Sequence, residues 1–261
     1  MHTALRNKMS CLIPDSATEY GFRIKQGGAH SSKTMMLREM RLLFAASTPD
    51  TDFTELRRLT VEENVLLKAT LSNRAEVWRR LTELYALKQE LPLYRALRAL
   101  WDSSESEQPM LALLCALARD PLLRATAPAV LEQPVCAVVS AQLLEDAVEA
   151  AFPQRYSSKT RLSISQNTTA TWAQSGHLVG KLKKVRQHPV VGPAAAAFAL
   201  LLAYLCDARG TLLFDTCWVE ALDIDTGGID SLAFAASRHG WLDYRRIGSV
   251  ADIGFSHLLQ I

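Results

Sequence analysis

The segment from Val190 to Cys206, VVGPAAAAFALLLAYLC, constrains the fold most, because it carries no charge and is almost wholly apolar. It is 17 residues long, and Gly192 and Pro193 lie near its start. The helical part after Pro193 is too short to cross about 30 Å of hydrocarbon. We therefore expect a buried core helix in a globular protein and no membrane span.

The rest of the sequence predicts helices joined by short loops. Ser31 or Ser32 can cap a helix that ends near Ala46. Thr60 and Glu63 form a capping-box pattern, which predicts a helix to about Ala69, and Ser72 caps the next helix. Further helices are expected after Pro92, Pro109, Ser140, Ser158, Pro193, Leu213 and Asp230. Two segments have weaker patterns: His177–His188 predicts a β-hairpin or a loop, and Trp241–Phe255 predicts a wing-like hairpin.

The predicted fold class is all-α, with two packed helical halves, helix-turn-helix elements and one or two short β-hairpin wings. Prolines at 121, 128 and 134 predict short helical turns and a boundary between the halves. The expected organisation is an irregular leader with a mobile start over residues 1–30, an N-terminal helical domain over 31–125 and a C-terminal helical domain over 126–261.

The sequence lacks the patterns that carry enzyme chemistry. It has no G-x-S-x-G elbow, no H-E-x-x-H and no glycine-rich phosphate loop, so we expect no enzyme activity, no cofactor and no metal. The five cysteines are widely spaced and form no C-x-x-C pair, which predicts reduced thiols in a cytoplasmic protein. The start of the chain does not resemble a signal peptide.

Charge is distributed unevenly along the chain. The net charge is only +2, but residues 150–206 contain no Asp or Glu. The same window holds seven cations: Arg155, Lys159, Arg161, Lys181, Lys183, Lys184 and Arg186. Because a polyanion responds to the local field, this segregation matters more than the total, and it favours nucleic acid as a partner.

A first candidate DNA-binding element lies within Thr60–Leu87. Two capped helices joined by a short turn are the pattern of a helix-turn-helix motif. In the second helix, Ala75 is expected to pack inward and Trp78 to point outward. The outward residues expected to contact DNA are Asn73, Arg74 and Arg79. An ordinary amphipathic helical hairpin has the same periodicity, and neighbouring glutamates weaken the functional interpretation.

A second candidate element is the window without acidic residues. Its helix and the basic run after it offer cationic, hydroxyl and amide groups that bind phosphates and base edges. The residues expected to contact DNA are Ser158, Lys159, Arg161, Gln166, Asn167, Lys181, Lys183, Lys184 and Arg186. The alternative is that these charges meet the acidic face of a partner protein, or a compensating acidic surface elsewhere in the fold.

Several runs together resemble the BrxA family of bacteriophage-exclusion (BREX) systems. They are LREMRLL, TVEENVLLKATLSNRAEVWRRLTELYAL, LPLYRALRALW, NTTATWAQSGHLVGKLKKV and WLDYRRIGSVADIGF, and they cover about Ser31 to Phe255. The most specific positions are Asn167, Trp172, Gly176, His177 and Leu178. The resemblance implies a small helical accessory protein of a phage-defence island, with two helix-turn-helix motifs and affinity for double-stranded DNA. It implies no enzyme activity and no cofactor.

The sequence therefore predicts a cytoplasmic, monomeric, non-catalytic protein that binds double-stranded DNA with little sequence preference. The resemblance adds other BREX components, a methyltransferase and an ATPase, as expected partners. One alternative is a protein–protein scaffold within the defence complex. Another is an RNA-binding helical module in which Trp172 or Trp78 stacks on bases.

Overall fold

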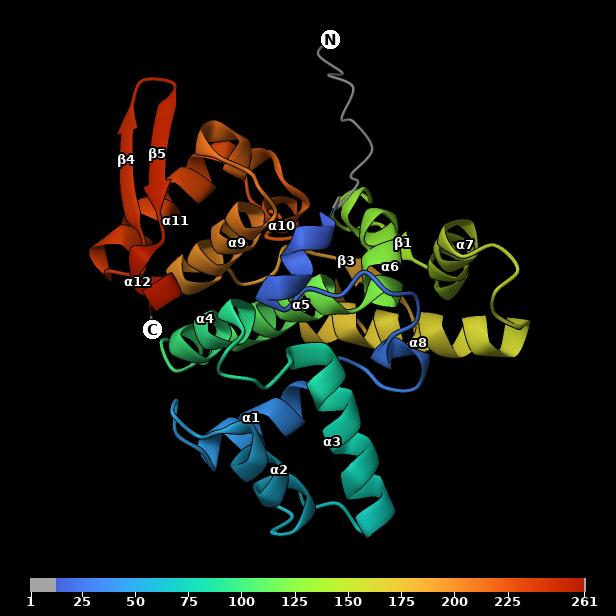
Figure 1. Cartoon of the computed structure of the whole chain (residues 1–261). Coiled ribbons are helices and arrows are strands. Elements are labelled where there is room, and N and C mark those ends of the chain that lie inside the picture. Colours follow the sequence, from blue (N-terminus) through green and yellow to red (C-terminus); the bar gives the residue numbers. More distant parts are fainter. Residues whose placement is uncertain (1–12, 261) are drawn as a thin grey trace.

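A computed structural model describes residues 13–260, which form a mostly helical protein with two small antiparallel sheets (Figure 1). The α-helices are α1 (Leu37–Ala45), α2 (Phe53–Val61), α3 (Leu71–Tyr85), α4 (Pro92–Trp101), α5 (Gln108–Arg119), α6 (Pro121–Leu131), α7 (Ala141–Ala151), α8 (Ser158–Gln174), α9 (Pro193–Leu205), α10 (Cys217–Glu220), α11 (Thr226–Arg238) and α12 (Ser256–Gln260). Three short 3-10 helices are η1 (Asp15–Tyr20), η2 (Ala29–Ser31) and η3 (Gly210–Asp215). The strands are β1 (Val138–Val139), β2 (Leu178–Val179), β3 (Lys184–Arg186), β4 (Asp243–Ile247) and β5 (Val250–Gly254). The prediction of an all-α fold is thus confirmed for most of the protein, which is helical, but the structure also contains these short strands.

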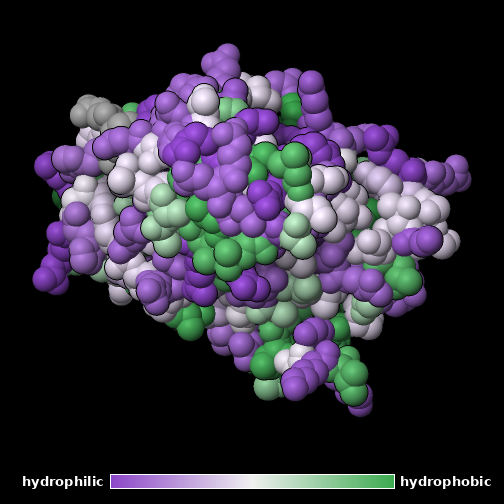
Figure 2. Space-filling model, turned by 90° about the horizontal axis from the view of Figure 1, so that it is seen from below, coloured by the Kyte–Doolittle hydropathy of each residue, from purple (hydrophilic) through white to green (hydrophobic). Residues whose placement is uncertain are grey.

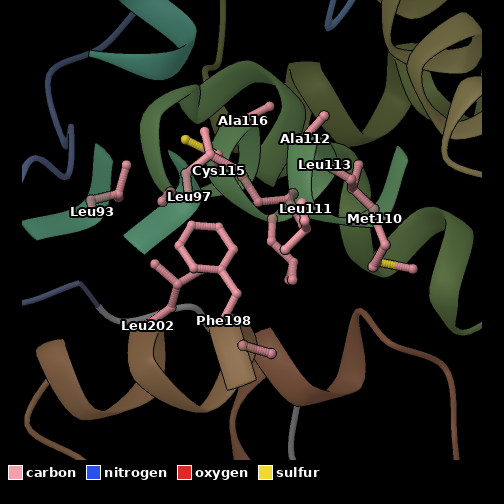
Figure 3. Close-up of a cluster of buried hydrophobic side chains, with 14 of the residues drawn as sticks. Leu93, Leu97, Met110, Leu111, Ala112, Leu113, Cys115, Ala116, Phe198 and Leu202 are labelled. Atoms are coloured by element: carbon pink, nitrogen blue, oxygen red, sulfur yellow. The ribbon is translucent and has the colours of Figure 1, made fainter. Parts of the chain in front are cut away.

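The apolar segment Val190–Cys206 supplies α9, which packs against α5 in the centre of the molecule (Figure 1). Phe198 and Leu202 of α9 face Leu97 of α4 and Leu111 of α5, as Figure 3 shows. All four side chains are fully buried. This confirms the expected core helix. Across residues 13–260, every helix is too short or too polar to cross a membrane.

Helix α6 occupies the place where the sequence predicts only short turns. Asp120 caps this helix by accepting the backbone N–H groups of Leu122 and Leu123, and Pro121 supplies the favoured first residue. These start signals make one helix of 11 residues, and Pro128 lies inside it. The main buried apolar cluster runs from the N-terminal helices through α5 to α9 and the C-terminal helices, so the two expected halves share one core.

The N-terminal lobe contains α1, α2 and α3 and projects from the rest of the molecule (Figure 1). The helix expected from Thr60 to Ala69 is absent. Thr60 is instead buried in the last turn of α2, where its hydroxyl donates to the Leu56 carbonyl. Thr70, not Ser72, caps α3 by accepting the Asn73 backbone N–H. The capping-box pattern was misleading because Asp52 starts a helix that ends just after Thr60.

Residues 13–36 are irregular apart from η1 and η2, and some of their side chains, among them Phe22 and Met35, are buried in the core. Ala29 and His30 are fully buried, and His30 binds Asp120 at the start of α6 and Thr171 of α8. The mobile start expected for the chain falls on residues 1–12, which lie outside the described residues.

The cysteines differ from the expectation of reduced core thiols. Cys115 is a buried free thiol, and Cys136 is a free thiol on the surface. Cys217 is disulfide-bonded, so the prediction of five reduced thiols is wrong at that position. Cys206 is a third free thiol, so the prediction of reduced thiols holds at these three positions.

Candidate nucleic-acid interface

The outer face of α3 carries charges that are already neutralised. Arg79 binds the carboxylates of Glu76 at 2.8 Å and Glu83 at 3.2 Å, one turn away on the same helix. Arg74 donates to the Lys68 carbonyl of the preceding loop and to the Val61 carbonyl at the end of α2, and Asn73 is exposed in the first turn. The predicted directions of two neighbours are reversed. Ala75 is exposed, whereas Trp78 is buried against Phe53 with ring centroids 5.0 Å apart.

Helix α8 presents an outer ridge with no acidic residue. Ser157 caps the helix by accepting the Thr160 backbone N–H, and Ser158 and Lys159 are exposed in the first turn. One and two turns later, Leu162 and Gln166 are also exposed. This periodicity leaves a continuous outer surface, while Ile164, Thr168, Thr171 and Trp172 are buried on the other side.

Two of the predicted contacts on α8 have partners within the protein. Arg161 forms an ion pair with Glu149 at 3.0 Å and also donates to the Tyr156 carbonyl. Asn167 is half-buried, and its side-chain amide donates to the His30 carbonyl at 3.0 Å. The charge of Arg161 is therefore compensated by Glu149, and Asn167 holds the N-terminal segment onto α8.

The basic run after α8 forms a hairpin, which settles the choice between hairpin and loop. Strands β2 and β3 pair in antiparallel register, and Lys181 and Lys183 project from the connecting turn. Gly180 has φ +103°, and a Cβ there would overlap the Lys183 carbonyl oxygen, so this turn requires glycine. The Lys184 ammonium donates to the Gly180 carbonyl at 2.6 Å and closes the turn.

Arg186 belongs to the protein interior, although it follows the lysines directly in sequence. Its side chain is only 1% exposed and forms an ion pair with Asp223 at 2.8 Å. It also donates to the Val130 carbonyl at the end of α6. Alternation along β3 places Arg186 on the covered face of the sheet, so its guanidinium is not available to a phosphate in this structure.

The three-stranded sheet has the order β1-β3-β2, and α7 and α8 lie between β1 and β2 in sequence. Strand β3 therefore lies between a strand that precedes the two helices and a strand that follows them. Helix α8 has 17 residues and a length of about 25 Å. Lys159 lies near its start, whereas the hairpin lysines follow its end, so the cations of the acid-free window form two groups separated by the helix.

His177 fixes the base of the hairpin and stays neutral. It is fully buried, with Nδ1 2.8 Å from the Ser175 hydroxyl and Nε2 2.9 Å from the Ala221 carbonyl oxygen. Burial, reinforced by the nearby Arg186 charge, lowers the pKa of His177 to about 3. Since only a neutral ring fits here, His177 cannot serve as a cationic phosphate contact. His188 is exposed and binds the Asp223 carboxylate.

The tryptophans proposed as stacking platforms for RNA are not on the surface. Trp172 is fully buried and donates from its indole N–H to the Thr126 hydroxyl at 2.9 Å. Trp78 is 9% exposed and packs on Phe53. Neither ring offers a free face to a base, so the specific basis of the RNA alternative is wrong.

One buried network combines a carboxylate, an imidazole and a hydroxyl. Asp120 accepts from His30 Nδ1 at 2.8 Å, and His30 Nε2 lies 2.8 Å from the Thr171 hydroxyl. The Thr171 oxygen also accepts the Met35 backbone N–H. All three side chains are sealed from solvent, so no substrate reaches the hydroxyl and the network serves to tie the N-terminal segment to α6 and α8. Within residues 13–260, His, Cys, Asp and Glu form no group suited to a metal ion.

The sequence interpretation missed two features of the hairpins. Leu182 stands between Lys181 and Lys183 at the tip of the first hairpin and is fully exposed. The sequence feature that could have identified Leu182 is the presence of an apolar residue within a run of basic residues. The second hairpin, β4–β5, confirms the hairpin expected within Trp241–Phe255 and carries Arg245 and Arg246, which lie outside the window without acidic residues. Arg246 is bound to Asp230 at 2.7 Å.

No protein-family model matches this chain, and no curated protein matches it.

Proposed function

We propose that this protein binds double-stranded DNA without catalysing a reaction, through α8 and the β2–β3 hairpin. The supporting observation is the order of elements from α6 to β3. A helix, a strand, two helices and a hairpin, with sheet order β1-β3-β2, make the arrangement of a winged helix-turn-helix. By analogy with that arrangement, α8 takes the place of the recognition helix and the lysine hairpin takes the place of the wing.

The dimensions of this surface suit a duplex. The two groups of cations are separated by about 25 Å of helix, which spans about seven base pairs at about 3.4 Å each. Lys159, Ser158 and Gln166 would face one groove and its phosphates, while Lys181 and Lys183 would contact the backbone beside the next groove.

Charge pairing favours this surface over α3. Among residues 13–260, the Lys181 and Lys183 ammonium groups are exposed and form no ion pair, whereas Arg79 and Arg80 share Glu76 and Glu83. An uncompensated cation attracts phosphate more strongly than one already bound to a carboxylate. The α3 residues remain a prediction and are secondary in this proposal.

The resemblance to the BrxA family supplies the biological setting of the proposal. The protein would be an accessory component of a bacterial BREX defence system and would act in the cytoplasm beside the methyltransferase and ATPase of that system. Binding through phosphates suits such a role, since it recruits a complex to DNA of any sequence.

A charge-reversal experiment tests the proposal. The triple variant Lys181→Glu, Lys183→Glu, Lys184→Glu should lose duplex binding and remain folded, because Lys181 and Lys183 are exposed and half-buried Lys184 contributes only its bond to the Gly180 carbonyl. A matched control, Arg57→Glu, Lys88→Glu, Arg238→Glu, changes the net charge equally at exposed positions on other elements. Fluorescence anisotropy with a labelled duplex measures both. Equal affinity of the two folded variants would reject the hairpin as the site.

A protein scaffold is the second candidate function, and one surface favours it. Val138, Val185 and Val179 are cross-strand neighbours in a row across the three strands. Val138 is 58% exposed and Val179 is 48% exposed, so this row is uncovered in the isolated chain. The variant Val138→Lys, Val179→Lys should keep DNA binding; if it loses capture of a BREX component from a lysate that holds the whole system, the scaffold function gains support.

A further inference from the structure

The tip of the β2–β3 hairpin ends in an apolar side chain. Leu182 is 101% exposed, and no other large apolar residue in the described part of the chain projects as far, the next being Ile247 at 85%. Its sequence neighbours Lys181 and Lys183 are exposed cations. A leucine in this position adds nothing to the core of the folded chain, so its apolar surface is free for a partner.

The hairpin holds Leu182 on a rigid support. At its base, Arg186 is bound to Asp223 and His177 is bound to the Ala221 carbonyl oxygen. The Gln187 side chain donates to the Gly176 carbonyl at 3.0 Å. At its tip, the Lys184 ammonium closes the turn onto Gly180. The leucine is therefore presented by an arm that is fixed at both ends.

The chemistry of this tip restricts what it can do on a duplex. Lysines on either side bind phosphates, which places the tip at a groove. A leucine side chain accepts and donates no hydrogen bond, so it cannot read base edges by hydrogen bonding. What it can do is enter the minor groove and push between two stacked base pairs, which unstacks them and kinks the duplex.

We propose that Leu182 is a wedge that inserts between base pairs and bends the DNA that the protein binds. This inference rests on the proposed function and extends it, because it assigns the protein an architectural effect on DNA. The cost of unstacking depends on sequence and is smallest at flexible pyrimidine–purine steps such as TA. Binding therefore favours a duplex with a TA step under the tip over a stiff A-tract.

The second hairpin provides a matched control. Its tip also carries an exposed aliphatic side chain, Ile247. The adjacent Arg246 is bound to Asp230, and Asp252 is the register partner of Arg245. Truncating Ile247 removes a similar apolar surface from a tip whose adjacent cation is already paired, so it controls for any general effect of exposed aliphatic groups.

The experiment measures bending separately from affinity. The full-length protein is bound to a duplex of roughly three helical turns, labelled at its two ends for fluorescence energy transfer and carrying a central TA step. Permanganate oxidation of thymine reports unstacking at the same step. The parent protein should raise the transfer efficiency and the thymine reactivity, and it should prefer the TA duplex to an A-tract duplex of equal length.

Leu182→Ala should lose the bend, the thymine reactivity and the preference for the TA duplex. Its affinity in low salt should stay within about threefold of the parent, because phosphate contacts dominate binding. Ile247→Ala should behave as the parent in all three measurements. Since Leu182 makes no contribution to the core, the alanine variant folds normally.

The outcomes separate the wedge from the proposed function. Absence of duplex binding by the parent protein would reject the proposed function. Binding without a bend, or a bend that Leu182→Ala retains, would overturn the wedge and leave the proposed function standing.

Discussion

Lys183 and Arg186 lie three residues apart on one hairpin, yet they have opposite roles. Lys183 extends into solvent, whereas the Arg186 guanidinium is sealed against Asp223 and the end of α6. Lys183 lies in the turn before β3, whereas Arg186 is the last residue of β3 and its side chain lies on the covered face of the sheet. A run of basic residues therefore divides into surface cations and an internal anchor.

Removing the internal anchor should lower the stability of the protein more than removing a surface lysine, and should weaken its contact with DNA less. Arg186→Met removes the cation from a mostly buried ion pair and leaves the Asp223 carboxylate without it. Breaking such a pair lowers the free energy of unfolding by about 3 kcal/mol. Urea unfolding should show this decrease, while Lys183→Met should leave the unfolding free energy within about 0.5 kcal/mol of the parent. For duplex binding by the folded fraction, the order reverses, and Lys183→Met weakens binding more than Arg186→Met does. A stable Arg186→Met variant would contradict the assigned role.

His177 should make stability depend on pH in a range where carboxylates do not titrate. Its pKa is lowered to about 3 in the folded state, against about 6.5 for a free histidine, so the unfolded chain binds the extra proton first. The contribution is complete above pH 6.5 and is lost as the pH falls towards 3. Between pH 6.5 and 5, unfolding free energy should drop by about 1.5 kcal/mol.

Chemical denaturation at a series of pH values measures this slope. The variant His177→Gln cannot take up the proton, and its unfolding free energy should vary less over the same interval. Equal slopes for parent and variant would show that another group is responsible.

At the level of the elements, start signals were the most informative part of the sequence. Pro92, Ser140 and the pair Ser157–Ser158 mark the beginnings of α4, α7 and α8, because a fixed φ or a capping oxygen acts locally. Thr60 misled for the same reason. Its hydroxyl satisfies a carbonyl at the end of a helix as readily as an amide at the start, and only the tertiary position of α2 decides between them.

The candidate site was predictable in outline but not in detail. The absence of acidic residues from 150 to 206 is a property of the sequence alone, and it pointed to α8 and the lysine hairpin. The inward direction of Arg186, the bond from Asn167 to His30 and the burial of Trp78 depend on contacts from distant segments. The local sequence pattern around each residue does not indicate such long-range contacts.

The hairpin should depend on the glycine in its turn. Gly180→Ala places a Cβ against the Lys183 carbonyl oxygen at a backbone φ of +103°, which β-carbon-bearing residues rarely adopt. The turn must shift, at a cost of about 1 to 3 kcal/mol, and the positions of Lys181 and Lys183 shift with it. Duplex affinity measured by anisotropy should fall. Gly240→Ala is the control, because it also has positive φ but lies outside this hairpin with open space around it.

For the molecule as a whole, the shared core couples the two ends of the chain. Phe198 of α9 packs among residues of α4 and α5, in a cluster that continues into both the N-terminal and C-terminal helices (Figure 3). Figure 2, which looks onto the N-terminal lobe, shows hydrophilic and hydrophobic residues mixed on that face, in contrast to this apolar cluster.

Truncating the central aromatic side chain should therefore weaken the whole protein in one step. Phe198→Ala removes a fully buried ring and should lower the unfolding free energy by about 3 to 5 kcal/mol. Far-ultraviolet circular dichroism and tryptophan fluorescence should give coincident transitions for parent and variant. Two separate transitions would indicate halves that unfold independently, as the proline boundary suggested.

The contacts of His30 also set an order of events during synthesis. One of its partners, Thr171, follows it by 141 residues. At a translation rate of about 5 to 20 residues per second, the segment around His30 waits roughly 7 to 28 seconds on the ribosome before that partner is made. The segment around His30 thus lacks this partner while the intervening residues are made, and during this interval its apolar residues are accessible to chaperones.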